Sequence, residues 1–128
     1  MNKVLESKYK EVKGESVAPI EIKNIFNCIT LVSVTMTSSY SKLCTNLASY
    51  GMIEPIILIE NSYGNWELVS SLFSPLDINL NNRNHYRWLA VKGTSKLAFA
   101  QIYKYDYIDS IILKNADLNK INSFYNAD

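Results

Sequence analysis

The sequence predicts an α+β fold, a small mixed β-sheet flanked by helices, in a single domain spanning residues 1–128. Short apolar runs rich in β-branched residues, which are typical of strands, alternate with segments whose apolar residues recur at helical spacing. No internal repeat or linker-like stretch divides the chain. Its 128 residues are enough to bury a core without disulfides or a structural metal.

The composition excludes several classes of protein. Hydrophobic residues make up 48% and charged residues 20%, as in an ordinary globular protein. The net charge of +1 gives no general attraction to nucleic acid or to an anionic membrane, so direct DNA binding is not expected. No apolar run reaches the roughly 20 residues that span a bilayer, and the polar N-terminus lacks the apolar core of a signal peptide. We therefore expect a cytoplasmic protein with no membrane association.

The cysteines and the histidine give no sign of a metal site. Cys28 and Cys44 are too far apart to form a CxxC pair, and His85 has no partner at metal-ligand spacing. Both cysteines have apolar neighbours, which favours buried, inert thiols over nucleophiles.

The first half of the chain predicts four elements in order. Residues 1–15 are charged and read as a mobile arm or a short helix. Residues 16–26, "SVAPIEIKNIF", suit an edge strand that enters a short helical turn, because proline is tolerated at a sheet edge. The β-branched run 27–39 predicts a second strand. Residues 38–50 predict a helix that Ser38 or Ser39 caps and Gly51 ends.

The second half predicts a central sheet and two further helices. The continuous apolar run in 52–60, "MIEPIILIE", is typical of a strand that is covered on both faces. The remaining expected elements are a turn at 61–65, the returning strand of a hairpin at 66–73, a long Asn-rich loop at 74–86, a strand at 86–91, a helix at 94–104, a strand at 109–114 and a C-terminal helix over 115–128 that Asp117 caps.

The sequence "VKGTSK" marks the candidate phosphate site. A strand that ends in glycine and opens a helix gathers backbone N–H groups at the positive end of the helix dipole. Gly93 permits close approach, Thr94 and Ser95 supply hydroxyls, and Lys96 supplies charge. The same tetrapeptide is also common turn chemistry, in which Thr94 or Ser95 is an N-cap and Lys96 a solvated surface charge. It lacks the spacing of a P-loop.

Four further residues are candidates around this turn. Arg83, His85 and Arg87 lie upstream and could form a basic rim at the same mouth, or simply belong to a solvated loop. Glu54, in the turn before Pro55, could hold a metal–phosphate or accept a proton, although exposed loop glutamates usually do neither.

The stretches "YGMIEPIIL" and "YRWLAVKGTSKLAFAQIYKYDYIDSIIL" resemble the ParB/sulfiredoxin-like superfamily, in particular the ParB-like N-terminal domain, of which this chain would be a divergent small member. The resemblance covers residues 16–114. The residues that carry it are Gly51, Pro55 and Ile56, then Gly93, Leu97, Ala98 and Ala100, and finally Ile108 to Leu113.

The chain departs from the superfamily pattern in ways that bear on function. Lys96 stands where the family turn usually has arginine, so a point charge replaces a planar bidentate donor. The turn has no cysteine, which excludes the sulfinic acid reductase chemistry of sulfiredoxins. The Glu-Asn nucleotide motif and the helix-turn-helix of chromosome-segregation members are not found, and the stretch 71–85 resembles an insertion.

The resemblance implies a nucleotide- or phosphate-binding module with at most weak phosphohydrolase or nuclease-like activity, a nucleotide with Mg²⁺ as cofactor, and Glu54 as the catalytic residue. The alternative is a non-catalytic adaptor that keeps the fold and binds a protein partner or a second copy of itself. The abundance of Asn, Lys, Ile and Tyr points to an AT-rich genome, such as that of a phage or a mobile element.

Overall fold

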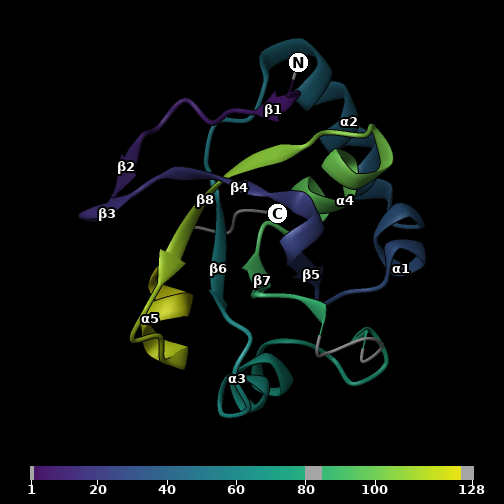
Figure 1. Cartoon of the computed structure of the whole chain (residues 1–128). Coiled ribbons are helices and arrows are strands. Elements are labelled where there is room, and N and C mark those ends of the chain that lie inside the picture. The colour runs from purple at the N-terminus through teal and green to yellow at the C-terminus, as the bar shows by residue number, and fades with distance from the viewer. Residues whose placement is uncertain (1, 80–84, 125–128) are drawn as a thin grey trace.

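The protein is built on one mixed β-sheet, seen in a computed structural model that describes residues 2–79 and 85–124 (Figure 1). The main path through the sheet is β1-β8-β6-β7-β5, and β4 pairs with β8 outside this path. The strands are β1 (Val4–Leu5), β4 (Ala18–Glu21), β5 (Ile25–Asn27), β6 (Ile56–Glu60), β7 (Trp88–Lys92) and β8 (Tyr107–Leu113), with β2 (Glu11–Val12) and β3 (Glu15–Ser16) forming a separate hairpin.

Strand β8 organises the sheet because three strands pair with it. It runs parallel to β1 and to β6, and antiparallel to β4. Beyond β6, the strand β7 is antiparallel and β5 is parallel to β7. The α+β class with a mixed sheet is therefore confirmed, as is the expected edge strand at Pro19, which leads into the 3₁₀ turn η1 (Ile22–Asn24).

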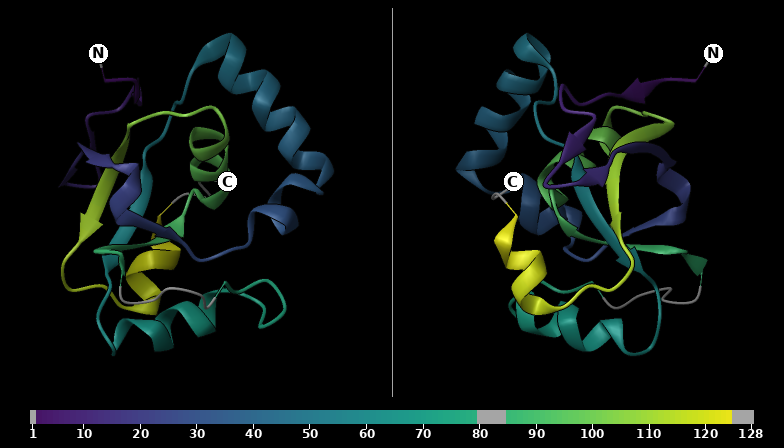
Figure 2. Two further views of the ribbon diagram at one scale, coloured as in Figure 1. Left: turned by 45° about the vertical axis from the view of Figure 1, so that its right-hand side comes forward. Right: turned by 90° about the vertical axis from the view of Figure 1, so that its left-hand side faces the viewer.

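Helices cover both faces of this sheet (Figure 2). Leu47 of α2 and Leu97 of α4 belong to the core on one face, while Val69 of α3 and Ile121 of α5 belong to the core on the other. The helices are α1 (Leu31–Thr35), α2 (Ser38–Tyr50), α3 (Asn65–Leu72), α4 (Thr94–Ile102) and α5 (Leu118–Ser123).

The continuous apolar run of strand β6 is explained by the burial of both faces of this strand. Ile56 and Leu58 point into the core beneath α2 and α4, whereas Ile57 and Ile59 point into the core beneath α3 and α5, and all four are buried. Side chains of a strand alternate between faces, so only a strand covered twice needs four apolar residues in succession. The prediction of a doubly covered strand is confirmed.

Two predicted strands are wrong, because both segments are helical. Within 27–39 the strand β5 ends at Asn27 and helix α1 follows, capped by Thr30, whose side chain accepts from the Ser33 N–H at 3.2 Å. This cap outweighs the modest helix penalty of β-branched residues. The segment 66–73 forms most of α3, with Trp66, Val69 and Leu72 on its inner side. Their spacing of three is helical, so no hairpin forms with β6.

Most of the other expected elements are present. Helix α2 ends at Gly51, which has a φ of 73°, although Thr37 rather than a serine occupies its N-cap position. The strands β7 and β8 and the helix α4 lie where they were predicted. Asp117 caps α5 by accepting from the Lys120 N–H at 2.7 Å, as expected. In the loop, residues 74–79 form no helix or strand, and residues 80–84 lie outside the described residues.

The N-terminal residues belong to the sheet, in place of the arm or short helix expected over 1–15. β1 pairs with β8, and the buried Asp109 carboxylate of β8 accepts from the Ser7 N–H at 2.9 Å and from Lys10 Nζ at 2.8 Å. The β2–β3 hairpin then reaches the C-terminal helix, where Lys120 Nζ lies 3.3 Å from Glu15 Oε1.

Candidate functional site

The turn between β7 and α4 requires glycine. Gly93 has a φ of 81° and occupies the N-cap position of α4. A Cβ atom added there would lie 2.9 Å from the Cβ of Ile56 on the neighbouring strand β6, closer than such atoms approach in proteins. Gly93 therefore serves both the left-handed conformation and the close contact of the helix start with the sheet.

Thr94 and Ser95, the two hydroxyl residues of the turn, differ in exposure, and neither is the N-cap of α4. Thr94 is only 1% exposed, so its side chain is out of reach of a ligand at the surface. Its carbonyl accepts a hydrogen bond from the Asn27 side chain at 3.2 Å. Neither Thr94 nor Ser95 is the N-cap of α4, since Gly93 holds that position and no side chain caps the helix. Ser95 is half-buried. Ser95 and Lys96 are therefore the two residues of this turn whose side chains can contact a ligand.

Asn27 is a site residue that the sequence analysis missed. It is buried at the end of β5, and its Oδ1 accepts from the Ile29 N–H at 3.1 Å while its Nδ2 donates to the Thr94 carbonyl. It thus joins the end of β5 to the start of α4. The sequence indicates this residue only by its place, directly after the apolar pair "IF". An amide buried beside such a pair needs specific hydrogen-bond partners.

Lys96 is not a solvated surface charge. Its side chain is only 8% exposed, and its Nζ donates to the main-chain carbonyl of Glu54 at 3.2 Å. The first turn of α4 therefore places an ammonium group against the segment that links α2 to β6. A charge in such a position is less screened than one in water and interacts more strongly with an approaching anion.

Lys96 and Glu54 line the same hollow, of about 280 Å³. Its polar wall consists of these two residues and Asn46, while the remainder is apolar or glycine. The other lining residues are Leu43, Leu47, Gly51 and Ile53. Glu54 also borders a neighbouring hollow of about 320 Å³ on the side of the β2–β3 hairpin. Lys96 of the turn and Glu54, predicted from distant parts of the sequence, thus line one hollow, whereas Gly93, Thr94 and Ser95 are not among its lining residues.

The predicted basic rim does not meet this hollow. Arg87 and His85 precede β7, whereas Gly93 follows it, and a strand of five residues spans about 16 Å. The Arg87 guanidinium lies 4.9 Å from the centroid of the Trp88 ring, and the main-chain N–H of Arg87 donates to the Asn24 carbonyl at 3.0 Å. The expectation that His85 and Arg87 converge on the turn is wrong, and Arg83 lies outside the described residues.

The buried cysteine Cys28 offers no nucleophile. Burial raises the pKa of the Cys28 thiol to about 12, so this thiol is neutral at physiological pH. Cys44 is half-buried on α2. Over residues 2–79 and 85–124, no three His, Cys, Asp or Glu side chains gather in a way that could hold a metal ion. In the same part of the chain, none of the helices has the length and apolar character needed to cross a membrane.

Comparisons with known proteins do not place the chain in a family. No model of a known protein family matches the sequence, and a search of curated proteins finds no match.

Proposed function

We propose that this protein binds a phosphorylated ligand, most simply a nucleotide, through Lys96 at the start of α4. The observation that carries the proposal is the position of the Lys96 ammonium, 3.2 Å from the Glu54 carbonyl at a hollow that both residues line. A lysine whose stem is buried and whose charged end borders a hollow is held ready for an anion, because little side-chain entropy remains to be lost on binding.

The rest of the hollow suits a ligand with an anionic and a less polar end. The N-terminal end of α4 adds partial positive charge beside Lys96. Leu43, Leu47 and Ile53 provide an apolar wall against which a base or another flat group would pack. Gly93 and Thr94 shape the turn, and Ser95 and Lys96 contact the phosphate. The resemblance of this turn to that of ParB-like proteins supports the same proposal.

Glu54 is the one carboxylate that lines this hollow among residues 2–79 and 85–124. If the ligand carries Mg²⁺, the Glu54 carboxylate is the protein group that would approach the metal or accept a proton from an attacking water. Any hydrolysis that results is expected to be weak, because among the described residues neither a second carboxylate nor a histidine lines the hollow.

Titration calorimetry with nucleoside triphosphates, with and without Mg²⁺, tests the proposal. Lys96→Met keeps the buried stem and removes the charge, and we expect it to weaken binding by about tenfold or more, since a hydrogen bond to a charged group contributes about 1.5–3 kcal/mol. Lys96→Arg should retain much of the affinity. Lys114→Met removes the same charge from an exposed position outside the hollow and is the matched control.

Two results would overturn the proposal. One is a wild-type protein that binds neither nucleotides nor inorganic phosphate. The other is an affinity that Lys96→Met leaves unchanged while the variant keeps the fold, as judged by its circular dichroism.

A second candidate function, an adaptor that self-associates, is favoured by a different observation. The short helix α1 exposes Leu31 and Val32, and Met36 directly after it is 81% exposed. Apolar side chains grouped on one surface commonly mark an interaction site. This function would be favoured over the first if titration with nucleotides showed no binding. The molar mass of the wild type should then rise with protein concentration, and Val32→Lys should lower it.

A further inference from the structure

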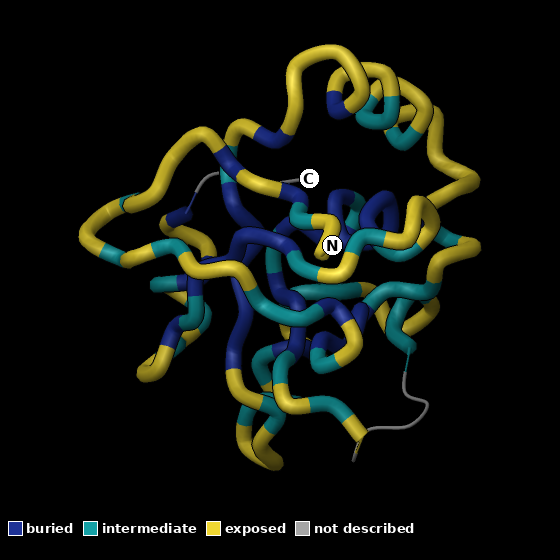
Figure 3. Tube along the Cα trace, turned by 45° about the horizontal axis from the view of Figure 1, so that its top comes forward, coloured by how far each residue is buried: buried dark blue, intermediate teal, exposed yellow. Residues whose placement is uncertain are grey.

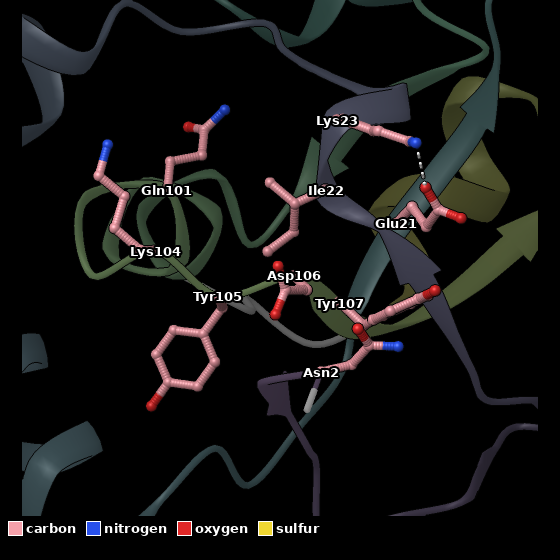
Figure 4. Close-up of a pocket in the computed structure, with 9 residues that line it drawn as sticks. All are labelled: Asn2, Glu21, Ile22, Lys23, Gln101, Lys104, Tyr105, Asp106 and Tyr107. Atoms are coloured by element: carbon pink, nitrogen blue, oxygen red, sulfur yellow. Dashed lines mark ion pairs between the residues drawn. The ribbon is translucent and has the colours of Figure 1, made fainter.

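A second and larger hollow, of about 500 Å³, lies at the opposite end of α4 from Lys96 (Figure 4). Its size is typical of a site for a small molecule. Gln101 and Lys104 line it from the end of α4, Ile22 lies on the side of β4 and η1, and Asp106 lies below Ile22 in the view of Figure 4. The remaining lining residues are Asn2, Glu21, Lys23, Tyr105 and Tyr107.

Lys104 has an unusual backbone conformation at the edge of this hollow. Its φ is 61°, a left-handed value that lysine rarely adopts. The N–H of Tyr105 donates to the Ala100 carbonyl at 2.9 Å, and that of Lys104 to the Gln101 carbonyl at 3.4 Å. This is the Schellman ending of a helix, in which glycine usually occupies the position of Lys104. Strained residues of this kind cluster at binding sites, where the side chain is needed.

The described residues that line the hollow include two cationic and two anionic side chains. Lys23 Nζ lies 3.0 Å from Glu21 Oε2, so these two groups neutralise each other. The other charged lining groups are the Lys104 ammonium and the Asp106 carboxylate. Asp106 Oδ2 accepts from the Lys3 N–H at 2.7 Å, which ties this carboxylate to the N-terminal segment. A ligand of one sign would be attracted by one of the two groups and repelled by the other.

We propose that this hollow binds a small zwitterion, a molecule whose short carbon skeleton carries both an ammonium group and a carboxylate or phosphate. The anionic group lies against Lys104 and the ammonium against Asp106, with the carbon chain over Ile22. A free amino acid and a phosphorylated amino alcohol share this chemistry. The site is independent of the phosphate site at Lys96.

Nuclear magnetic resonance titrations test the ligand class and its source. The probes are L-leucine and phosphoethanolamine, and the controls are isoamylamine and isocaproate, which are leucine without its carboxylate and without its ammonium. We expect one of the zwitterions to shift the amides of residues 101–107 and to bind about tenfold more tightly than either singly charged control. Leucine and phosphoethanolamine then distinguish a carboxylate ligand from a phosphate ligand.

Lys104→Gly separates binding from stability. This variant should lose zwitterion binding and at the same time melt at a higher temperature, because glycine adopts a positive φ without strain. Lys13→Gly is the matched control, since Lys13 also has a positive φ, of 52°, but lies in the β2–β3 turn outside this hollow. It should remove the same charge and leave zwitterion binding unchanged.

Asp106→Asn keeps an acceptor for the Lys3 N–H and removes the negative charge. We expect it to abolish the preference for zwitterions over isocaproate. The proposal is overturned if neither zwitterion shifts the amides of residues 101–107, if both singly charged controls bind as tightly as the zwitterions, or if Lys104→Gly binds within about twofold of the wild type. Should Lys104→Gly fail to fold, Lys104→Asn replaces it, because asparagine also tolerates this conformation.

Discussion

Gly93 sets the geometry of the candidate phosphate site. Two separate requirements meet at this residue, a φ of 81° and a contact with Ile56 that leaves no room for a side chain. The start of α4 is thereby pressed against β6, and Lys96 is carried to within 3.2 Å of the Glu54 carbonyl. A change at Gly93 should therefore affect both the stability of the fold and the position of Lys96.

We predict that Gly93→Ala lowers the free energy of unfolding by about 2–5 kcal/mol. Left-handed backbone costs a non-glycine residue about 1–2 kcal/mol, and overpacking against Ile56 adds about 1–3 kcal/mol. The measurement is urea unfolding followed by tryptophan fluorescence. Gly14→Ala is the control, because Gly14 has the same φ of 81° but nothing lies within 4 Å of an added Cβ. Equal losses in the two variants would contradict the steric argument.

The sequence was informative about the identity of the turn residues and uninformative about their burial. Gly93 at a strand–helix junction follows from the local pattern "VKGTSK". The burial of Lys96 does not, because its hydrogen-bond partner Glu54 is 42 residues away in the sequence. The separation of Arg87 from the turn, by contrast, follows from the strand predicted at 86–91, which lies between them along the chain and forms β7. Local chemistry could be predicted, whereas proximity in space could not.

Among the elements, helix starts were easier to predict than the class of short apolar segments. Asp117 caps α5 as expected, because the signal lies within four residues. The segments 27–39 and 66–73 were expected to be strands, yet the first contains α1 and the second forms most of α3. Short apolar runs fit either class, and the deciding contact is tertiary: Val69 packs into the core with Phe26 and Ile57.

The cap of α5 gives a prediction at this scale. Asp117→Ala should lower the free energy of unfolding by about 1 kcal/mol, because the Lys120 N–H loses its acceptor at 2.7 Å. Asp117→Asn should be nearly neutral, since asparagine caps helices as well as aspartate does. Chemical denaturation of both variants measures the difference. A loss of the same size in Asp117→Asn would show that the charge, rather than the hydrogen bond, stabilises α5.

At the scale of the whole molecule, the N-terminal segment is a structural part of the domain. Asp109 is buried on β8, where its carboxylate accepts from the Ser7 N–H and from Lys10 Nζ. The hydrogen bond from Lys10 to Asp109 raises the pKa of Lys10. The Lys10 side chain is 64% exposed, so solvent screens its attraction to Asp109. Of these two interactions of Asp109, the buried hydrogen bond from Ser7 therefore contributes more to holding this segment on the sheet than the bond from Lys10 does.

We expect Asp109→Ala to release residues 4–10 from the sheet and to lower the free energy of unfolding by about 2–3 kcal/mol, since the Ser7 N–H loses a charged acceptor. Hydrogen exchange is the direct measurement, with the Ser7 amide protected in the wild type and exchanging rapidly in the variant. Lys10→Met should have little effect on this protection. Unchanged protection in Asp109→Ala would show that the pairing of β1 with β8 suffices by itself.

The class of the fold could be predicted from the sequence, but the order of its strands could not. Alternating strand-like and helix-like segments predict an α+β sheet protein, and the doubly covered strand β6 was assigned from four apolar residues in succession. Nothing in the sequence indicates that β8 pairs with three strands, because pairing depends on register and on which segments approach in space. The buried middle and the largely exposed outer helix α2 are visible in Figure 3.

The central position of β8 also has a consequence for how the chain reaches its native state. β1 and β4 are among the earliest segments to leave the ribosome, yet their pairing partner β8 is among the last. During synthesis, the backbone groups of β1, of β4 and of one edge of β6 stay unpaired until residues 107–113 emerge from the ribosome. Folds dominated by such distant pairings close slowly, because the entropy of a long loop is lost before any contact compensates for it. Completion of the domain is therefore expected to follow release of its C-terminal third.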